Sequence, residues 1–170
     1  MSFDGTQLRK LKAKIRDQYI KHREVDGKTL YYLEGWHMIS EANRIFGFDS
    51  WDRETISSQC VCQKQLNTGF TASYLTRVKI TVRAGDKIIL REGIGSGEAV
   101  ALTPGQAHER ASKAAETDAT KRALSTFGNP FGLSLYREKA EPSKQRIYDA
   151  SHHKRNFQEP ELPTKEVEKS

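Results

Sequence analysis

Four acidic residues lie close together in the first third of the chain, and carboxylates are common ligands of catalytic metal ions. They are Glu34, Asp49, Asp52 and Glu54. Carboxylates that hold two divalent cations can support phosphodiester cleavage, so a metal-dependent nuclease is one interpretation of this cluster. Neither an HxE nor a DxD motif accompanies these residues, and acidic side chains near turns are ordinary on protein surfaces. The sequence therefore favours solvated acids over a metal site.

The two cysteines, Cys60 and Cys62, raise the question of redox or zinc chemistry. In a strand, residues i and i+2 point to the same face, and such neighbours rarely form a disulfide. A zinc site would need partners at ligand spacing, and none of the histidines is so placed; these are His22, His37, His108, His152 and His153. We therefore expect two packed, reduced thiols, with neither a metal nor a cofactor.

The glycines of GIGSGEAV, which are Gly93, Gly95 and Gly97, resemble a phosphate-binding loop only superficially. A P-loop ends in Gly-Lys-Ser/Thr, and a dinucleotide fingerprint needs G-x-G-x-x-G at the start of a helix. Neither pattern is present. We predict a flexible or bulged connection rather than a nucleotide site.

An excess of basic residues points to a polyanionic partner. The chain has 28 Lys and Arg against 22 Asp and Glu, a net charge of +6, and a pI of about 9.3. This balance favours nucleic acid first and an acidic membrane surface second. Lys121 and Arg122 fall in the last turns of an expected helix. There they could contact phosphate, or simply favour the helix dipole by about 0.3–1 kcal/mol, and the residues alone support both equally.

The most regular pattern in the chain is an alternation that predicts a long strand with one buried face. The apolar positions are Phe70, Ala72, Tyr74, Thr76, Val78, Ile80 and Val82. Arg77, Lys79 and Arg83 then share the opposite face and are further candidates for DNA contact. A turn at Ala84, Gly85 and Asp86 leads into a returning strand from Lys87 to Glu92.

Other elements flank this hairpin. We expect an amphipathic N-terminal helix from residue 6 to about 21 with a basic outer face. A polar connection follows, then a strand over 29–33, a helix over 36–46 and a strand over 51–62. A long helix begins after the N-cap Thr103 and runs to about Phe127. A stripe of small residues along it suits close packing; the stripe is Ala107, Ala111, Ala115 and Ala119. The sequence thus predicts an α+β fold.

The ends of the chain carry no expected membrane or secretory segment. No apolar run approaches the roughly 20 residues of a membrane helix, and the N-terminus lacks the apolar core of a secretory signal. We expect one domain over 1–137 and a disordered charged tail over 138–170, because the tail has too few apolar residues to offset ordering entropy. The expected location is intracellular: cytoplasm or nucleoid in a bacterial or phage protein, nucleus or organelle otherwise.

Three stretches together resemble a known family. They are YYLEGWHMISEANRIFGFDSW over Tyr31–Trp51, the long strand with its AGD turn, and ETDATKRALSTFGNPFG over Glu116–Gly132. In this order and separation they are similar to the DNA-binding core of the Rad fifty-two family of recombination and single-strand annealing proteins. The resemblance covers roughly residues 8–136. It implies a β-hairpin sheet crossed by the long helix, in a protomer that forms a homo-oligomeric ring.

The resemblance also implies a function without catalysis: binding of single-stranded DNA and ATP-independent annealing in recombination and repair. The family's inner groove uses basic residues that match Arg23, Lys121 and Arg122 here. Ser125 stands where the family often has an arginine. Two family lysines of an outer DNA site fall near Ala101 or Leu102 and near Phe70. DNA-end protection without annealing remains an alternative, and a recombinase or single-strand-binding protein is a possible partner.

The aromatic side chains bear on the mode of binding. A protein that sequesters single strands stacks bases on aromatic rings. Here the aromatic residues mostly fall within apolar patterns, so we assign them to the core; they include Tyr32, Phe46, Phe48, Tyr74 and Phe127.

Overall fold

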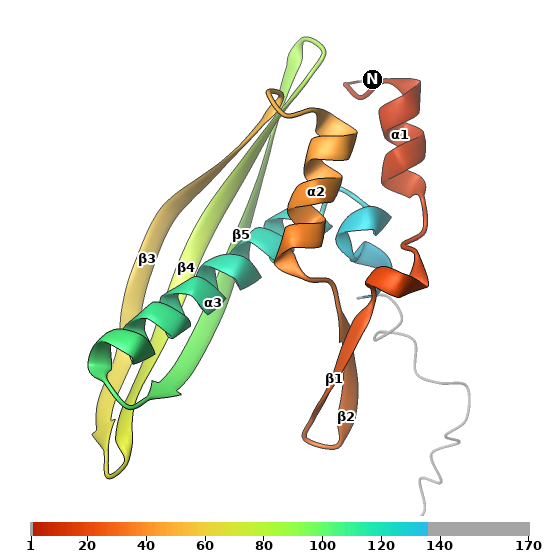
Figure 1. Ribbon diagram of the computed structural model, residues 1–170. Helices are drawn as coiled ribbons and strands as arrows, with labels where there is room; N and C mark the ends of the chain where they lie inside the picture. Colours follow the sequence, from red (N-terminus) through yellow and green to blue (C-terminus); the bar gives the residue numbers. More distant parts are fainter. Residues whose placement is uncertain (1, 136–170) are drawn as a thin grey trace, which may run out of the picture.

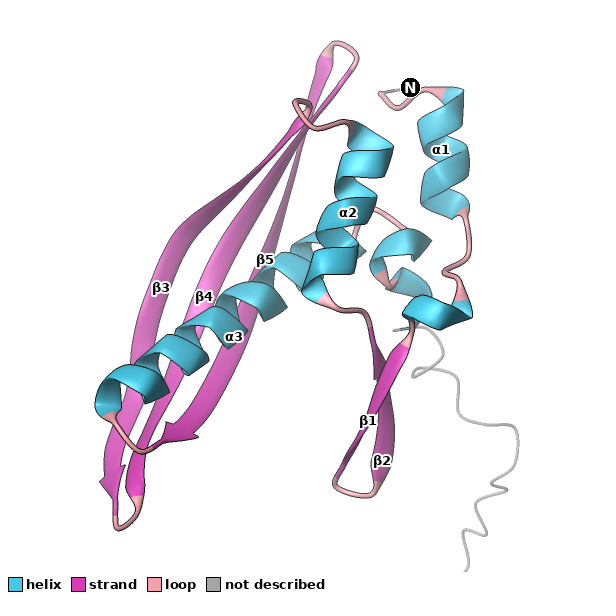
Figure 2. Ribbon diagram, viewed as in Figure 1, coloured by secondary structure: helices cyan, strands magenta, loops and turns pink. Residues whose placement is uncertain are grey.

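The computed structural model describes residues 2–135, which form an α+β fold of two antiparallel sheets and several helices (Figures 1 and 2). The helices are α1 (Gly5–Lys12), α2 (Gly35–Phe46) and α3 (Pro104–Ser125), with short 3-10 turns η1 (Asp17–Tyr19) and η2 (Asn129–Phe131). The strands β1 (Lys21–Val25) and β2 (Lys28–Tyr32) form a small hairpin. The strands β3 (Trp51–Leu66), β4 (Gly69–Ala84) and β5 (Lys87–Ala101) form a long meander in that order.

The alternation predicted for the central strand is confirmed. In β4, the side chains of Ala72, Thr76, Val78, Ile80 and Val82 are buried, while Arg77 and Arg83 on the other face are exposed. Figure 1 shows α3 lying across one face of the meander, so the buried face of β4 is the one beneath this helix. The period of two therefore predicted correctly which side of the sheet carries the core.

The glycines of β5 let α3 approach the sheet closely, and the flexible connection predicted here is wrong. Gly93, Gly95 and Gly97 lie in regular pairing with β4. A Cβ at Gly95 would lie 2.8 Å from the Cα of Ala119, and one at Gly97 would lie 2.9 Å from the Cβ of Ala114. The alanine stripe of α3 is fully buried: Ala111, Ala115 and Ala119 lie against these glycines, and Ala107 packs near Ala72 and Ala101. Because both facing surfaces carry only small side chains, the backbone of α3 lies directly against the backbone of β5.

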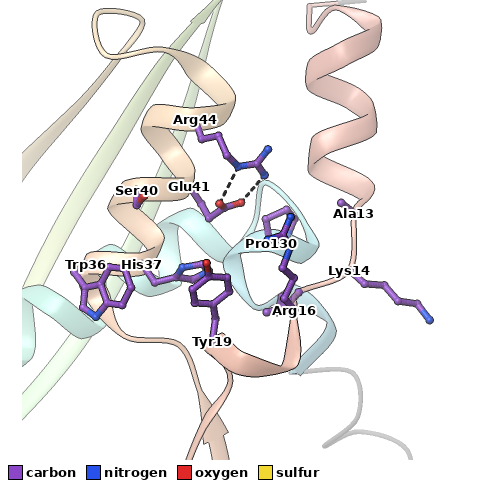
Figure 3. A pocket seen from close by; sticks show the side chains of 11 residues that line it. Ala13, Lys14, Arg16, Tyr19, Trp36, His37, Ser40, Glu41, Arg44 and Pro130 are labelled. Atoms are coloured by element: carbon purple, nitrogen blue, oxygen red, sulfur yellow. Dashed lines mark hydrogen bonds and ion pairs between the residues drawn. The ribbon is translucent and has the colours of Figure 1, made fainter.

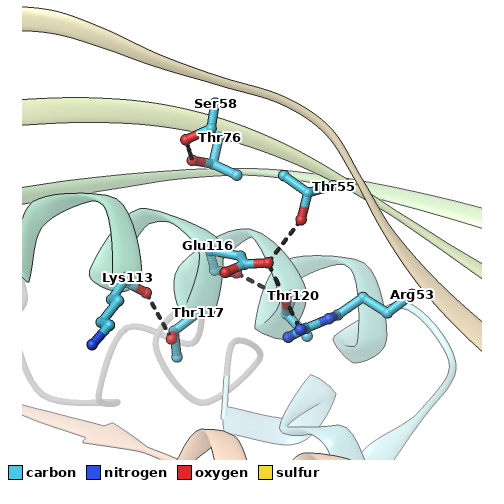
Figure 4. Close-up of polar contacts among 8 residues, drawn as sticks. All are labelled: Arg53, Thr55, Ser58, Thr76, Lys113, Glu116, Thr117 and Thr120. Carbon is cyan, nitrogen blue, oxygen red and sulfur yellow. Dashed lines mark hydrogen bonds and ion pairs between the residues drawn. The ribbon is translucent and has the colours of Figure 1, made fainter. Parts of the chain in front are cut away.

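Polar contacts hold α3 to the strands on either side of β4. Glu116 accepts a hydrogen bond from the Thr55 hydroxyl at 2.7 Å, and the Arg53 guanidinium lies 3.7 Å from the same carboxylate (Figure 4). On β5, the backbone N–H of Ser96 donates to the Asp118 carboxylate at 3.2 Å. These contacts fix the rotation of the helix about its axis, and so the direction in which its exposed side chains point.

A second region of the core lies beside the end of the sheet, where α1, α2 and η2 meet the end of α3. Aromatic rings pack there: Phe46 stacks on Phe131 at 5.8 Å between centroids and meets Phe127 edge to face at 5.1 Å. This packing confirms the core assignment of Phe46. The same assignment is wrong for Phe48, which is 86% exposed just after α2.

Besides the longer β5, element boundaries differ from the prediction at three places. The N-terminal helix ends at Lys12 because Ala13 is extended, with ψ of 144°, so Ile15 and Tyr19 belong to a linker and η1. The expected polar connection after it is β1, which turns into β2 through Asp26 and Gly27, both at positive φ. An Asp-Gly pair is typical of the tight hairpin turn that needs this geometry. The strand predicted over 51–62 extends to Leu66.

The two cysteines are not packed, contrary to prediction. Cys60 and Cys62 are both exposed, because they lie on the edge strand β3, whose residues are exposed almost throughout. The register of β3 also shifts between them and places Val61 in a bulge, so the i, i+2 relation that argued against a disulfide does not hold here. The predicted tail over 138–170 lies outside the described residues. None of the described helices is long and apolar enough to cross a membrane.

Candidate nucleic-acid interface

The three basic residues that the family resemblance selects converge on one groove. Arg23 on β1 and Lys121 and Arg122 on α3 line a hollow of about 350 Å³. Its floor is apolar and includes Leu33 and Met38. Arg23 is about a hundred residues away from Lys121 and Arg122 in the sequence. The hairpin lies beside the end of α3 and so brings the three residues together.

Tyr32 organises the cations of this groove. The Arg23 guanidinium lies 5.8 Å from the centroid of the Tyr32 ring, and the Lys121 ammonium lies 5.4 Å from it. At such distances the ring face attracts both cations. Tyr32 therefore lines the candidate site and lies between its cations. The alternation of residues in β2 could not predict these contacts, because it indicates only which face of a strand is covered and which is open.

Acidic neighbours limit the charge of the groove without cancelling it. The Arg122 guanidinium donates to the Asp118 carboxylate at 2.9 Å, one turn earlier on α3. Burial lowers the pKa of Lys121 below its ordinary value of 10.5, and Asp118 and Glu34 partly oppose this shift. A lysine that is partly desolvated and close to another cation is a favourable partner for an incoming anion.

The basic residues of β4 are not part of this groove. On the outer face of the sheet each is paired across strands: Arg77 with Glu92, Lys79 with Glu54 at 2.6 Å, and Arg83 with Asp52. These pairs are largely exposed and contribute little to stability. Arg77 nevertheless lines a separate shallow hollow of about 540 Å³ together with Arg122 and Ser125.

The acidic cluster that suggested a nuclease is dispersed by the fold. Asp52 and Glu54 form the cross-strand pairs with Arg83 and Lys79, and Glu34 accepts a hydrogen bond from the Trp36 indole. Among residues 2–135, no group of three or more His, Cys, Asp or Glu side chains could hold a metal ion. Three positions carry uncharged residues where the family resemblance leads one to expect basic side chains. Ser125 is buried, and Ala101 and Phe70 pack together beneath the start of α3.

The described residues thus combine a strand meander with a glycine-rich edge strand, a long alanine-rich helix, and a basic groove between that helix and a small hairpin. The chain belongs to the Rad52/22 family of double-strand break repair proteins, whose pattern it matches over residues 4–154.

Several curated relatives are similar to this chain. It is 38% identical over 129 residues to the DNA repair and recombination protein RAD52 of Eremothecium gossypii, covering 75% of this chain and 29% of the relative. It is 38% identical over 130 residues to RAD52 of Saccharomyces cerevisiae, covering 75% and 27%. The protein rad22 of Schizosaccharomyces pombe is 31% identical over 130 residues, covering 74% and 27%. The chain thus spans under a third of the length of these relatives.

Proposed function

We propose that this protein binds single-stranded DNA in the groove formed by Arg23, Tyr32, Lys121 and Arg122, and that it anneals complementary strands without ATP in DNA repair and recombination. The observation that carries the proposal is the convergence of cations from β1 and α3 on one apolar-floored hollow. Membership of the Rad52/22 family and the names of the relatives support it.

The groove suits the sugar-phosphate backbone rather than particular base edges. Its cations come from two elements, one from a strand and two from a helix, and all of them can contact the phosphates of a bound strand. Contacts with phosphates position a strand and carry no sequence information. The bases of a strand bound in this way remain able to pair with a complement.

Annealing needs no covalent chemistry from the protein. Two strands repel each other through their phosphates, and neutralising part of this charge lowers the repulsion. Base pairing supplies both the specificity and the free energy. We therefore propose a binding and annealing protein rather than an enzyme.

We also propose that the protein acts as a homo-oligomer, with a ring as the arrangement that the family resemblance implies. The outer face of β5 exposes four large apolar side chains, Ile88, Leu90, Ile94 and Val100, with Glu92, Ser96 and Glu98 between them. Apolar patches of this kind often mark protein interfaces. The alanine stripe of α3 cannot form such an interface, because it is buried inside the protomer against the sheet.

DNA-end protection without annealing is the second candidate function. The same groove would serve it, because phosphate binding is common to both. The two functions differ only in whether a bound strand stays accessible to a complement.

The salt dependence of binding tests the groove directly. Each phosphate neutralised on a single strand contributes a slope of about −0.7 in log K against log salt. Arg23→Ala, and Lys121→Ala combined with Arg122→Ala, should lower the affinity for oligonucleotides of any sequence and flatten this slope. Fluorescence anisotropy at several salt concentrations measures both quantities.

Arg77→Ala and Lys79→Ala are matched controls, because both residues are basic but paired on the outer face. We expect a smaller effect from them. If these strand variants abolish binding while the groove variants bind normally, the site has been assigned to the wrong surface.

A further inference from the structure

A second basic hollow lies on the other side of the α2 N-terminus from the groove. It has a volume of about 420 Å³ and runs between α2 and the linker that joins α1 to η1 (Figure 3). Lys14 and Arg16 come from the linker, and Trp36, His37 and Arg44 come from α2. We refer to it as the Trp36 hollow.

The charge of the Trp36 hollow is positive. Lys14, Arg16 and Arg44 line it, and Glu41 is its only acidic lining residue among those the structure describes. Glu41 accepts two hydrogen bonds from Arg44, at 2.8 and 2.6 Å (Figure 3). The charges of Glu41 and Arg44 offset each other, so Lys14 and Arg16 supply the net positive charge that would attract an anion.

Trp36 is an exposed ring held in a fixed orientation. It is 61% exposed, yet its indole N–H donates to the Glu34 carboxylate at 2.9 Å. Its edge contacts His37, with ring centroids 5.7 Å apart and planes at 81°. An exposed tryptophan restrained at its polar edge and supported by a neighbouring ring offers a preformed surface for stacking.

His37 presents an unused polar group to the same hollow. Its side chain is 6% exposed and stacks on Tyr19 at 4.2 Å between centroids. Within residues 2–135 no group forms a hydrogen bond with its ring, although it lines the hollow. Burial lowers its pKa, so the neutral imidazole offers one donor and one acceptor. The ring nitrogens are not among the fully buried unsatisfied atoms of the described residues, so they reach the hollow and are candidate contacts for a ligand.

A smaller hollow leads from the Trp36 hollow to β1, the strand that carries Arg23 of the proposed DNA groove. This smaller hollow, of about 200 Å³, shares Trp36 and His37 with the Trp36 hollow and adds Lys21 and Glu34. Lys21 lies two residues before Arg23 on the same strand, and the Glu34 carboxylate acts electrostatically on Lys121 of the groove. Lys14 and Arg16, then Lys21, then Arg23 thus lead from the Trp36 hollow to the groove around the start of α2.

We propose that the Trp36 hollow binds the next segment of the single strand that occupies the groove, with one base stacked on Trp36 and its phosphate at Lys14 and Arg16. The inference rests on the proposed function, since it extends the same ligand along the surface. An acidic peptide would also meet the charge of the hollow. The position of Lys21 two residues from Arg23 and the flat exposed ring of Trp36 favour a nucleotide.

The emission of Trp36 tests this proposal. The chain has two tryptophans, and Trp51 is anchored away from the hollow by a 2.8 Å hydrogen bond to Asn43. In a Trp51→Phe variant, oligothymidylate should quench the emission of Trp36 at the same concentrations that raise the anisotropy of a labelled strand. A strand that binds by anisotropy and leaves the emission unchanged would overturn the inference but leave the proposed function standing. Failure to bind any strand would overturn both.

Affinity measurements on the full chain provide a second test. Trp36→Ala should weaken single-strand binding about tenfold, which equals about 1.4 kcal/mol and lies within the range for base stacking. Trp36→Phe should retain most of the affinity, and Lys14→Ala with Arg16→Ala should also reduce the salt slope. Phe48→Ala is the matched control, because Phe48 is an exposed aromatic residue outside all three hollows. Equal affinities of Trp36→Ala and Phe48→Ala, or quenching by a glutamate-rich peptide alone, would contradict the proposal.

Discussion

Tyr32 is the residue on which the proposed binding chemistry centres, because two cations from distant parts of the chain lie over its ring. The family resemblance predicts the basic members of the groove, whereas the residues alone leave Lys121 and Arg122 undecided between a helix dipole and a phosphate. For Tyr32 the sequence predicts a core position, since an aromatic residue in a short apolar strand is usually packed. The cations that lie near Tyr32 come from other elements. Only their positions show that this ring contacts charged side chains in addition to packing.

The lowered pKa of Lys121 predicts an unusual pH dependence of binding. Phosphate contact favours the charged ammonium, so the affinity for single-stranded DNA should fall as the pH rises through this pKa, earlier than for an ordinary lysine. The stability of the free protein should change the opposite way. The unfolded chain binds more protons between the lowered pKa and 10.5, so this group makes the folded state relatively more stable as the pH rises.

Lys121→Arg separates this effect from the titration of other groups. An arginine keeps its charge over the whole range, so the variant should bind with an affinity that stays level where the wild-type affinity declines. Anisotropy titrations between neutral and alkaline pH measure the difference. Parallel pH profiles for the two proteins would show that Lys121 does not contact the strand.

Among the contacts between secondary-structure elements, the packing of α3 on β5 is the one that the sequence does not predict. Both halves of it are visible, as a glycine triplet and an alanine stripe, but nothing in a single sequence states that they face each other. Glycine in a strand weakens it unless a backbone approaches closely. Without knowledge of that approach, the glycines predict a connection rather than a strand. The long strand β4 is predicted well because its period depends only on its own residues.

Gly95→Ala should destabilise the protein strongly. The new Cβ would lie 2.8 Å from the Ala119 Cα, and the atoms around it are helix backbone that cannot move aside. Overpacking typically costs about 1–3 kcal/mol, and we expect a loss at or above the upper end of this range. Urea unfolding at a fixed protein concentration measures the change.

Gly105→Ala is the matched substitution. Gly105 lies in the first turn of the same helix, and a Cβ added there would have no atom within 4 Å. Alanine is a better helix former, so the variant should be as stable as the wild type or more stable by up to about 1 kcal/mol. Similar unfolding midpoints for the two variants would mean that β5 and α3 are not in close contact.

At the scale of the whole molecule, α3 covers one face of the sheet and leaves the other face open. The pattern of β4 predicts both faces, but it does not predict the row of apolar residues on β5. The strand expected from Lys87 ends at Glu92, so Ile94 and Val100 fall outside it, and the row becomes visible only when β5 is continuous to Ala101. This row is the structural basis on which we expect self-association.

Leu90→Asp should reduce the size of the oligomer, because it places a charge within the exposed row. Leu102→Asp is the control, since Leu102 is also exposed but lies beyond the end of β5. Sedimentation velocity at micromolar concentration distinguishes the species. A wild-type protein that sediments only as a 19.3 kDa monomer would contradict the ring.

An annealing assay tests most directly whether this groove brings complementary strands together. Two complementary oligonucleotides, one with a donor and one with an acceptor fluorophore, are mixed in EDTA without any nucleotide. The wild-type protein should accelerate pairing, and Arg23→Ala combined with Lys121→Ala should lose most of that acceleration while Arg77→Ala retains it. A wild-type protein that binds the strands tightly but leaves the pairing rate at its spontaneous value would contradict annealing and favour end protection instead.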